Sequence, residues 1–345
     1  MRPALVLTIA ICVWVPASIA TFAGETARDD GTRFEFAQPH MGTTARVVLF
    51  APNQSKARKL ADRAFARIAE LDARLSDYRP ESELMTLCRA AGAPPVPVSD
   101  DLFTVLTAAQ RMAARTEGAF DVSVGPLSRI WRRARVTGER PDAASIAAAR
   151  TLVGYHRIEL SADHKVRLAK AGMLLDLGGI AKGYAADQAL AVLRAAGSGR
   201  ALVAIGGDIA AGDAPPHTDG WMVDVAALGP AALTRLPRVR LRAAAISTSG
   251  DAEQFVEING TRLSHLLTPS TGHPLEGRRG VTVVAPDGIT ADALATAVSV
   301  LDNARGLTLV DETEGAAALI VEKTANGVRE HRSSRWGQET QNAER

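Results

Sequence analysis

The stretch from Leu174 to Asp187, which reads LLDLGGIAKGYAAD, brings an acid, a glycine pair and a lysine close together in the chain. Its apolar beginning predicts a short strand through Asp176, the pair Gly178-Gly179 predicts a tight turn, and Lys182 stands where a helix is expected to start. Backbone N–H groups at such a turn, together with a lysine, suit a phosphate or another anion. The alternative is a plain strand-to-helix connection with solvated charges, because one glycine-rich turn is a weak signal.

A second candidate is the pair Asp292 and Thr296, which lie four residues apart in a predicted helix and therefore share one of its faces. A carboxylate and a hydroxyl offer two oxygens to a hard cation such as Mg²⁺, which takes few protein ligands besides substrate phosphates. The residues alone leave another reading open, in which Asp292 complements the helix dipole and Thr296 is a packing residue.

A third candidate is His265, which is expected at the end of a strand just before the loop that contains Pro269 and Pro274. An imidazole there can serve as a general base near neutral pH. A histidine among leucines is also a common core residue, so the role stays open at this point. His156, His217 and His273 have no supporting neighbours and are interpreted as surface or turn residues.

The composition is that of an ordinary globular protein: 345 residues, 46% hydrophobic and 23% charged, with a net charge of +2. This charge gives no indication of a nucleic-acid partner, and we interpret the basic run Arg129 to Arg140 as a solvated helix end. The chain has no GxxxxGK[ST], HExxH, GxSxG or CxxC motif, so phosphate-loop hydrolases, zincins, serine hydrolases and thioredoxin-like proteins lack support.

The first 23 residues have the pattern of a secretory signal peptide: Arg2, an apolar run from Ala4 to Val15, and then small residues. The apolar run is too short to span a membrane comfortably, so we expect cleavage after Ala20 or Ala23 and no stable membrane anchor. Cleavage would leave Cys88 as the only thiol, which excludes an intramolecular disulfide.

Hydrophobic periodicity and turn residues predict the remaining elements. A hairpin is expected over 34–50 with Met41-Gly42-Thr43 at its bend, and a second hairpin around Asn259-Gly260. Ser99 and Thr290 are the predicted helix N-caps. Predicted helices cover 55–75, 82–89, 102–116, 141–151, 184–196 and 290–300, and predicted strands include 201–205, 281–285 and, last in the chain, 316–321.

Irregular alternation of strands and helices, with hairpins in the second half, predicts an α+β fold with a mostly antiparallel sheet and flanking helices. We expect a disordered linker over 24–33, one domain over 34–325, and a disordered tail over 326–345.

Taken together, the chain resembles the ApbE family, the FAD:protein FMN transferases, from Met41 to about Glu322. The resemblance is carried, in order, by Met41-Gly42-Thr43, Leu75-Ser76 with Tyr78, Gly118-Ala119-Phe120-Asp121, Val124-Gly125-Pro126-Leu127 with Trp131, Val153-Gly154-Tyr155, the run from Asp176 to Tyr184, Ile205-Gly206-Gly207-Asp208, the run from Ser247 to Asp251, Ser264-His265, and the run from Ala291 to Thr296.

The resemblance implies an ApbE-like, T-fold-related architecture and a periplasmic enzyme that binds FAD and Mg²⁺. Such an enzyme transfers FMN to a threonine or serine of a partner protein through a phosphoester bond and releases AMP. The partners implied are flavin-bearing subunits of membrane redox complexes.

Matched position by position, the resemblance also implies roles for single residues. Asp292 and Thr296 become metal ligands by side chain, with the backbone carbonyl of Gly179 beside them. The implied FAD contacts are Met41, Tyr78, Ala119, Phe120, Asp121, Asp176, Lys182 and His265. His265 also becomes the catalytic residue that helps to deprotonate the acceptor hydroxyl.

The chain departs from the family at Thr268, where an aspartate is common, and this could change how His265 is oriented or charged. Two other functions remain open. One is an FAD pyrophosphatase that uses water as the acceptor and gives FMN and AMP. The other is a flavin-binding protein without catalysis.

Overall fold

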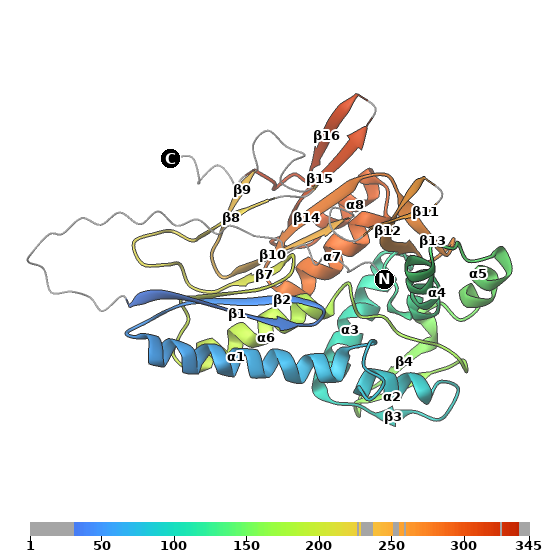
Figure 1. Ribbon diagram of the computed structural model, residues 1–345, viewed down its shortest axis with the longest axis horizontal. Helices are drawn as coiled ribbons and strands as arrows, with labels where there is room; N and C mark the ends of the chain where they lie inside the picture. Colours follow the sequence, from blue (N-terminus) through green and yellow to red (C-terminus); the bar gives the residue numbers. More distant parts are fainter. Residues whose placement is uncertain are drawn as a thin grey trace, which may run out of the picture.

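The protein is built around one eight-stranded sheet in which every neighbouring pair of strands is antiparallel (Figure 1). The computed structural model describes residues 31–225, 228, 237–250, 255–258, 260–324 and 326–337. Three smaller sheets and eight α-helices within these residues complete the fold. The prediction of an α+β fold with a mostly antiparallel sheet is confirmed.

The strands of the large sheet follow the order β1-β2-β6-β7-β10-β14-β15-β16. Their bounds are β1 Thr32–His40, β2 Thr43–Ala51, β6 Ala201–Ile205, β7 Asp208–Ala211, β10 Ala244–Gly250, β14 Arg279–Ala285, β15 Ala317–Thr324 and β16 Gly327–Arg332. The smaller sheets join β11 Phe255–Ile258, β12 Thr261–Thr268 and β13 His273–Glu276; β3 Val96–Pro97, β5 Lys165–Leu168 and β4 Ile158–Ser161; and β8 Trp221–Asp224 with β9 Arg238–Leu241.

The helices are α1 Gln54–Leu75, α2 Glu83–Arg89, α3 Asp100–Arg115, α4 Gly125–Thr137, α5 Ala143–Arg150, α6 Ala181–Ala195, α7 Gly288–Val300 and α8 Asn303–Asp311, with short 3-10 turns at Val122–Val124 and Tyr155–Arg157. Helices α1, α6 and α7 pack against the large sheet (Figure 1). Helix α1 does so through apolar residues at helical spacing, from Ala57 to Leu75.

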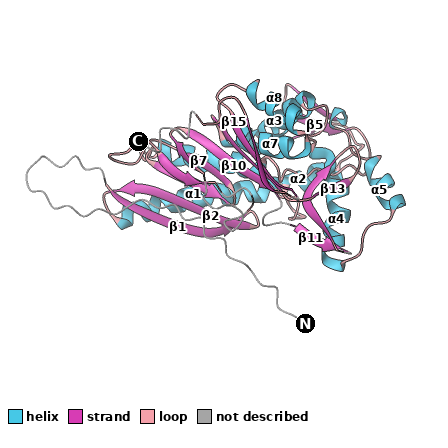
Figure 2. Cartoon of the chain, turned by 90° about the horizontal axis from the view of Figure 1, so that it is seen from above, coloured by secondary structure: helices cyan, strands magenta, loops and turns pink. Residues whose placement is uncertain are grey.

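The central strands of the large sheet are buried on both faces, since their successive side chains point to opposite faces and nearly all of them are buried. In β2, Val47 and Leu49 face the helix-side core, whereas Val48 belongs to a second core. That second core also holds Trp221 of β8 and Trp336. A third apolar cluster joins α4 and α5 to β12, and Figure 2 shows α4 and α5 beside the small sheet that contains β11 and β13.

Helices α6 and α7 touch through glycine. A Cβ placed on Gly183 would lie only 2.0 Å from the carbonyl oxygen of Gly288, so the two backbones are in direct contact. Asp187 of α6 accepts hydrogen bonds from the N–H groups of Gly288 and Ile289, at 2.8 and 3.0 Å. Burial raises the pKa of Asp187 to about 6. This contact fixes the first turn of α7 against α6.

Several local predictions need correction. The N-cap of α7 is Asp287, whose side chain accepts from the N–H of Thr290, so the cap lies three residues before the predicted one. The apolar run at 174–177 is not a strand, because its N–H groups do not bond to a neighbouring strand: that of Leu175 bonds to the sulfur of Cys88 in α2, and that of Asp176 to the carbonyl of Val122 in a 3-10 turn.

Both segments predicted to be disordered, the linker and the tail, include residues that form strands. Strand β1 begins at Thr32, inside the expected linker, because Arg33 pairs with Phe50 across the hairpin. The expected tail over 326–345 contains β16, which pairs with β15, and its Trp336 is buried. The polar composition of this segment predicted disorder, but polar side chains are also typical of an exposed edge strand such as β16.

The predicted signal peptide over 1–23, the linker through residue 30 and the tail from residue 338 lie outside the described residues. None of the helices in the described ranges has both the length and the apolar character that crossing a membrane requires.

We expect Trp336→Ala to lower the free energy of unfolding by about 3–5 kcal/mol, because it removes a large side chain that is only 8% exposed from the second core. Urea unfolding measures the change. Val328→Ala on β16 is the control, since Val328 is 44% exposed and its truncation should cost far less. Equal small losses in both variants would contradict a folded C-terminal segment.

Candidate functional site

Lys182, in the first turn of α6, lies between two carboxylates from distant parts of the chain. Its Nζ is 2.9 Å from Oδ2 of Asp208 and 3.7 Å from Oδ2 of Asp292, and it donates to the carbonyl of Gly178 at 3.0 Å. Burial acts to lower the pKa of Lys182, but the two carboxylates outweigh it and raise that pKa. Lys182 is therefore a fixed positive charge at the glycine turn.

Asp292 is 1% exposed and projects from α7 toward the start of α6. Its Oδ2 accepts the N–H of Gly183 at 3.0 Å. Burial and then the charge of Asp208 raise the pKa of Asp292 above its usual 3.8, against the opposing effect of Lys182. Two carboxylates that share one ammonium leave a net negative charge, so a further cation would be stabilised here.

Gly179 faces Thr296, one turn beyond Asp292 on α7. A Cβ on Gly179 would lie 2.7 Å from Thr296 Oγ1, so only glycine permits this approach. The structure therefore brings Asp292, Thr296 and Gly179 together. Within the described ranges no group of three His, Cys, Asp or Glu side chains could hold a metal. A single carboxylate with a hydroxyl and backbone oxygen fits Mg²⁺, which usually keeps several waters, better than it fits zinc.

Asp176 holds the loop that leads into the glycine turn. Its Oδ1 accepts the N–H of Gly178 at 2.9 Å, and its Oδ2 accepts from Nη2 of Arg132 at 2.8 Å. The Gly178 N–H is thus already bonded, which leaves the N–H of Gly179 as the turn's candidate for binding an anion.

Arg132 of α4 joins Asp176 to Tyr78. Its guanidinium also bonds to Asp77 and lies 4.1 Å from the centre of the Tyr78 ring. Tyr78 is 73% exposed, so much of its side chain is accessible to a ligand. Burial, and next the charge of Asp176, raises the pKa of Asp77, with Arg132 opposing. The exposed tyrosine offers a platform for a flat aromatic ring.

The basic run is therefore not simply a solvated helix end. Trp131 is buried and donates to the carbonyl of Gly272 at 2.8 Å, whereas Arg132 enters the site. Sequence reasoning missed Arg132, Asp77 and Asp208 as site residues. Asp208 had a usable signal, since it follows a fully buried strand and a glycine pair.

Met41 sits in the β1–β2 turn with a positive φ of 50°. The same turn continues into Thr43, which contacts Gly206, and Gly206 precedes Asp208 by two residues. The turn that carries Met41 therefore lies beside the β6–β7 turn that leads to Asp208.

The loop that contains Ala119, Phe120 and Asp121 supports the position of Asp176. Phe120 is 3% exposed, and Asp121 accepts from the N–H and hydroxyl of Ser123 and from the N–H of Tyr155. Burial raises the pKa of Asp121 against these hydrogen bonds. The adjacent carbonyl of Val122 receives the N–H of Asp176 at 2.8 Å, so this loop positions Asp176.

His265 lies on β12, which packs against α7. Arg135 of α4 donates to the His265 carbonyl at 3.3 Å, which ties this strand to the helix that carries Arg132. Thr268 closes the following turn through its carbonyl, which accepts the N–H of Gly272 at 2.8 Å.

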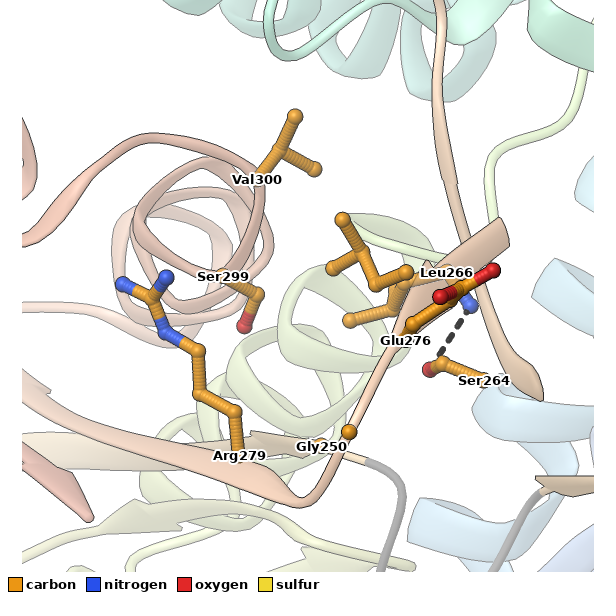
Figure 3. Close-up of a pocket in the computed structure, with 9 residues that line it drawn as sticks. Gly250, Ser264, Leu266, Glu276, Arg279, Ser299 and Val300 are labelled. Carbon is orange, nitrogen blue, oxygen red and sulfur yellow. Dashed lines mark hydrogen bonds between the residues drawn. The ribbon is translucent and has the colours of Figure 1, made fainter. Parts of the chain in front are cut away.

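A cavity of about 100 Å³ lies between β12, β13, β14 and the end of α7 (Figure 3). Ser264 and Leu266, the neighbours of His265, line it, and they are joined by a 3.1 Å hydrogen bond from the Leu266 N–H to Ser264 Oγ. Ser299 and Val300 line it from α7, and they continue the helix face that carries Asp292 and Thr296. The cavity thus extends the site along α7.

The chain is similar in sequence and in structure to known proteins. The model of the ApbE family matches residues 41–320. A Klebsiella pneumoniae protein named FAD:protein FMN transferase is 30% identical over 295 residues, which cover 83% of each chain. One of the same name from Vibrio cholerae is 31% identical over 306 residues, covering 86% of this chain and 89% of the relative. The solved apo structure of Pseudomonas stutzeri flavinyl transferase ApbE has a TM-score of 0.78 at 29% identity, covering 90% of this chain and 97% of the other.

Cys88 supports the site loop from the core, and we expect its thiol to be inert in the native protein. It is 4% exposed, and burial raises its pKa to about 11, so at pH 8 only about one thiol in a thousand is ionised. Only the thiolate reacts with a disulfide reagent. Labelling with such a reagent should be very slow in buffer and fast in guanidinium. Rapid labelling of the native protein would show that this loop opens readily.

Proposed function

The chain belongs to the ApbE family, and from this we propose that it is an FAD:protein FMN transferase. It moves FMN from FAD to a threonine or serine hydroxyl of a partner protein, forms a phosphoester bond and releases AMP. The observation that supports this most is the convergence of Lys182, Asp292 and the Gly179–Thr296 contact at one point. Such a point suits the diphosphate of a dinucleotide.

Attack on a diphosphate requires that the charge on its oxygens be neutralised. Mg²⁺ bound by Asp292, Thr296 and Gly179 would supply positive charge to those oxygens. Lys182 adds a second positive charge, held in place by the Gly178 carbonyl and Asp208. The exposed ring of Tyr78, backed by Arg132, receives the flavin.

His265 is the proposed base. The acceptor hydroxyl attacks the phosphorus of the FMN half, its proton passes to the imidazole, and the bond from that phosphorus to the oxygen of the AMP phosphate breaks. Because an alcohol has a high pKa, a general base assists this step. The hydrogen bond from Arg135 to the His265 carbonyl fixes the strand on which the base stands.

We place the reaction in the periplasm, because the first 23 residues have a signal-peptide pattern. The acceptor proposed is a flavin-bearing subunit of a membrane redox complex.

The test is to incubate the protein with FAD and Mg²⁺, with and without a flavoprotein acceptor. Fluorescent label on the acceptor in a denaturing gel, together with AMP, supports the transferase. AMP without label would make the protein an FAD pyrophosphatase. FAD binding with neither product would make it a flavin-binding protein.

We expect Asp292→Ala to abolish Mg²⁺-dependent labelling, because it removes the one carboxylate of the proposed metal site. Asp287→Ala is the matched control on the same helix: it removes the N-cap and costs about 1 kcal/mol of stability, but should leave labelling intact. Unchanged labelling in Asp292→Ala would count against the metal site.

We expect His265→Ala to slow labelling by about 10²–10⁴-fold with little change in FAD affinity, because proton transfer from the acceptor requires the imidazole, whereas the other proposed FAD contacts remain. FAD titration by fluorescence and labelling rates measure the two effects separately. His273→Ala, on the exposed start of β13, serves as the control. A large loss of FAD affinity in His265→Ala would show that His265 is structural.

A further inference from the structure

Asp208 is a buried carboxylate beside the site, and the proposed chemistry gives it no role beyond contact with Lys182. It is 3% exposed and stands at the start of β7, directly after the turn Gly206-Gly207. A carboxylate so buried is costly unless each oxygen has a partner. Both oxygens of Asp208 have one.

The two partners of Asp208 come from different elements. Oδ2 binds Nζ of Lys182 at 2.9 Å. Oδ1 accepts the hydroxyl of Ser247 at 2.5 Å, and Ser247 is 1% exposed. The β7–β10 register places Ser247 directly opposite Asp208, so the sheet itself fixes the carboxylate. Asp208 therefore presents one oxygen to Lys182 in a set orientation.

This orientation decides which carboxylate Lys182 binds. The 2.9 Å separation from Asp208 is a charge-assisted hydrogen bond, whereas the 3.7 Å separation from Asp292 is too long for one. Without the charge of Asp208, the ammonium would be drawn to the remaining carboxylate, Asp292. A lysine bound closely to Asp292 would compete with a metal ion for the same oxygens.

We propose that Asp208 is a positioning residue that holds Lys182 off Asp292 and so keeps the Asp292 carboxylate available to a divalent cation. Lys182 then remains beside the metal as a separate positive charge. The proposal rests on the metal site of the proposed function.

The experiment measures Mn²⁺ affinity by electron paramagnetic resonance, without FAD, in wild type, Asp208→Asn, Lys182→Met and the double variant. We expect Asp208→Asn to weaken Mn²⁺ binding at least tenfold. Lys182→Met should strengthen binding much more in the Asp208→Asn background than in wild type, because only there does Lys182 occupy Asp292. Such coupling in a double-mutant cycle isolates the interaction of the two side chains.

Asp101→Asn is the matched control. Asp101 is a buried carboxylate that binds Arg67 and Arg74 and also accepts from the hydroxyl of Tyr184 on α6 at 2.7 Å. Its neutralisation should lower stability, yet leave Mn²⁺ affinity unchanged, because none of these three partners is Lys182 or Asp292.

The outcomes separate the two hypotheses. If wild type binds no Mn²⁺, the metal site of the proposed function fails and the inference falls with it. If wild type binds Mn²⁺ but Asp208→Asn binds it equally well, only the positioning role fails. If Lys182→Met changes Mn²⁺ affinity equally in both backgrounds, Asp208 acts only through its own charge, and the positioning role is overturned.

Discussion

The backbone contact between α6 and α7 is the constraint on which the site depends. A Cβ on Gly183 would lie 2.0 Å from the Gly288 carbonyl oxygen and 2.8 Å from Cβ of Asp292, and a Cβ on Gly288 would lie 2.5 Å from the Gly183 carbonyl oxygen. Only two glycines allow helices to approach this closely. The same approach lets the Gly183 N–H reach Asp292, brings Lys182 near it, and seats Gly179 against Thr296.

Other elements of the fold place further site residues around this contact. The large sheet delivers Asp208 through the β6–β7 turn, and α4 delivers Arg132 to Asp176. From Tyr78 the polar contacts run through Arg132, Asp176 and Gly178 to Lys182. An extended ligand with a flat ring at one end and a charged centre fits such a row. Burying carboxylates and their cations costs desolvation free energy, so their clustering at this site indicates a functional role more than a stabilising one.

Most of the fold could be predicted from the sequence, because hydrophobic period and turn residues act locally. The hairpin at Met41, the helix predicted over 55–75 and the pairing of β11 with β12 depended on such signals. The errors arose where contacts with residues distant in the chain determine the local structure or the role of a residue. The run before Asp176 is held by Cys88 and Val122 rather than by a strand, and Arg132 acquires its role only from Asp77 and Asp176. Edge strand β16 lacks an apolar alternation because its side chains are mostly exposed, and the large apolar residue of this segment, Trp336, comes after the strand.

The most direct test of the account is a crystal structure grown with FAD and Mn²⁺, with the ion located by its anomalous scattering. The account predicts one manganese between the diphosphate and α7, coordinated by Asp292, Thr296 and the Gly179 carbonyl, with Lys182 on the same diphosphate. A manganese ion bound elsewhere, or a diphosphate that touches neither the glycine turn nor α7, would contradict it.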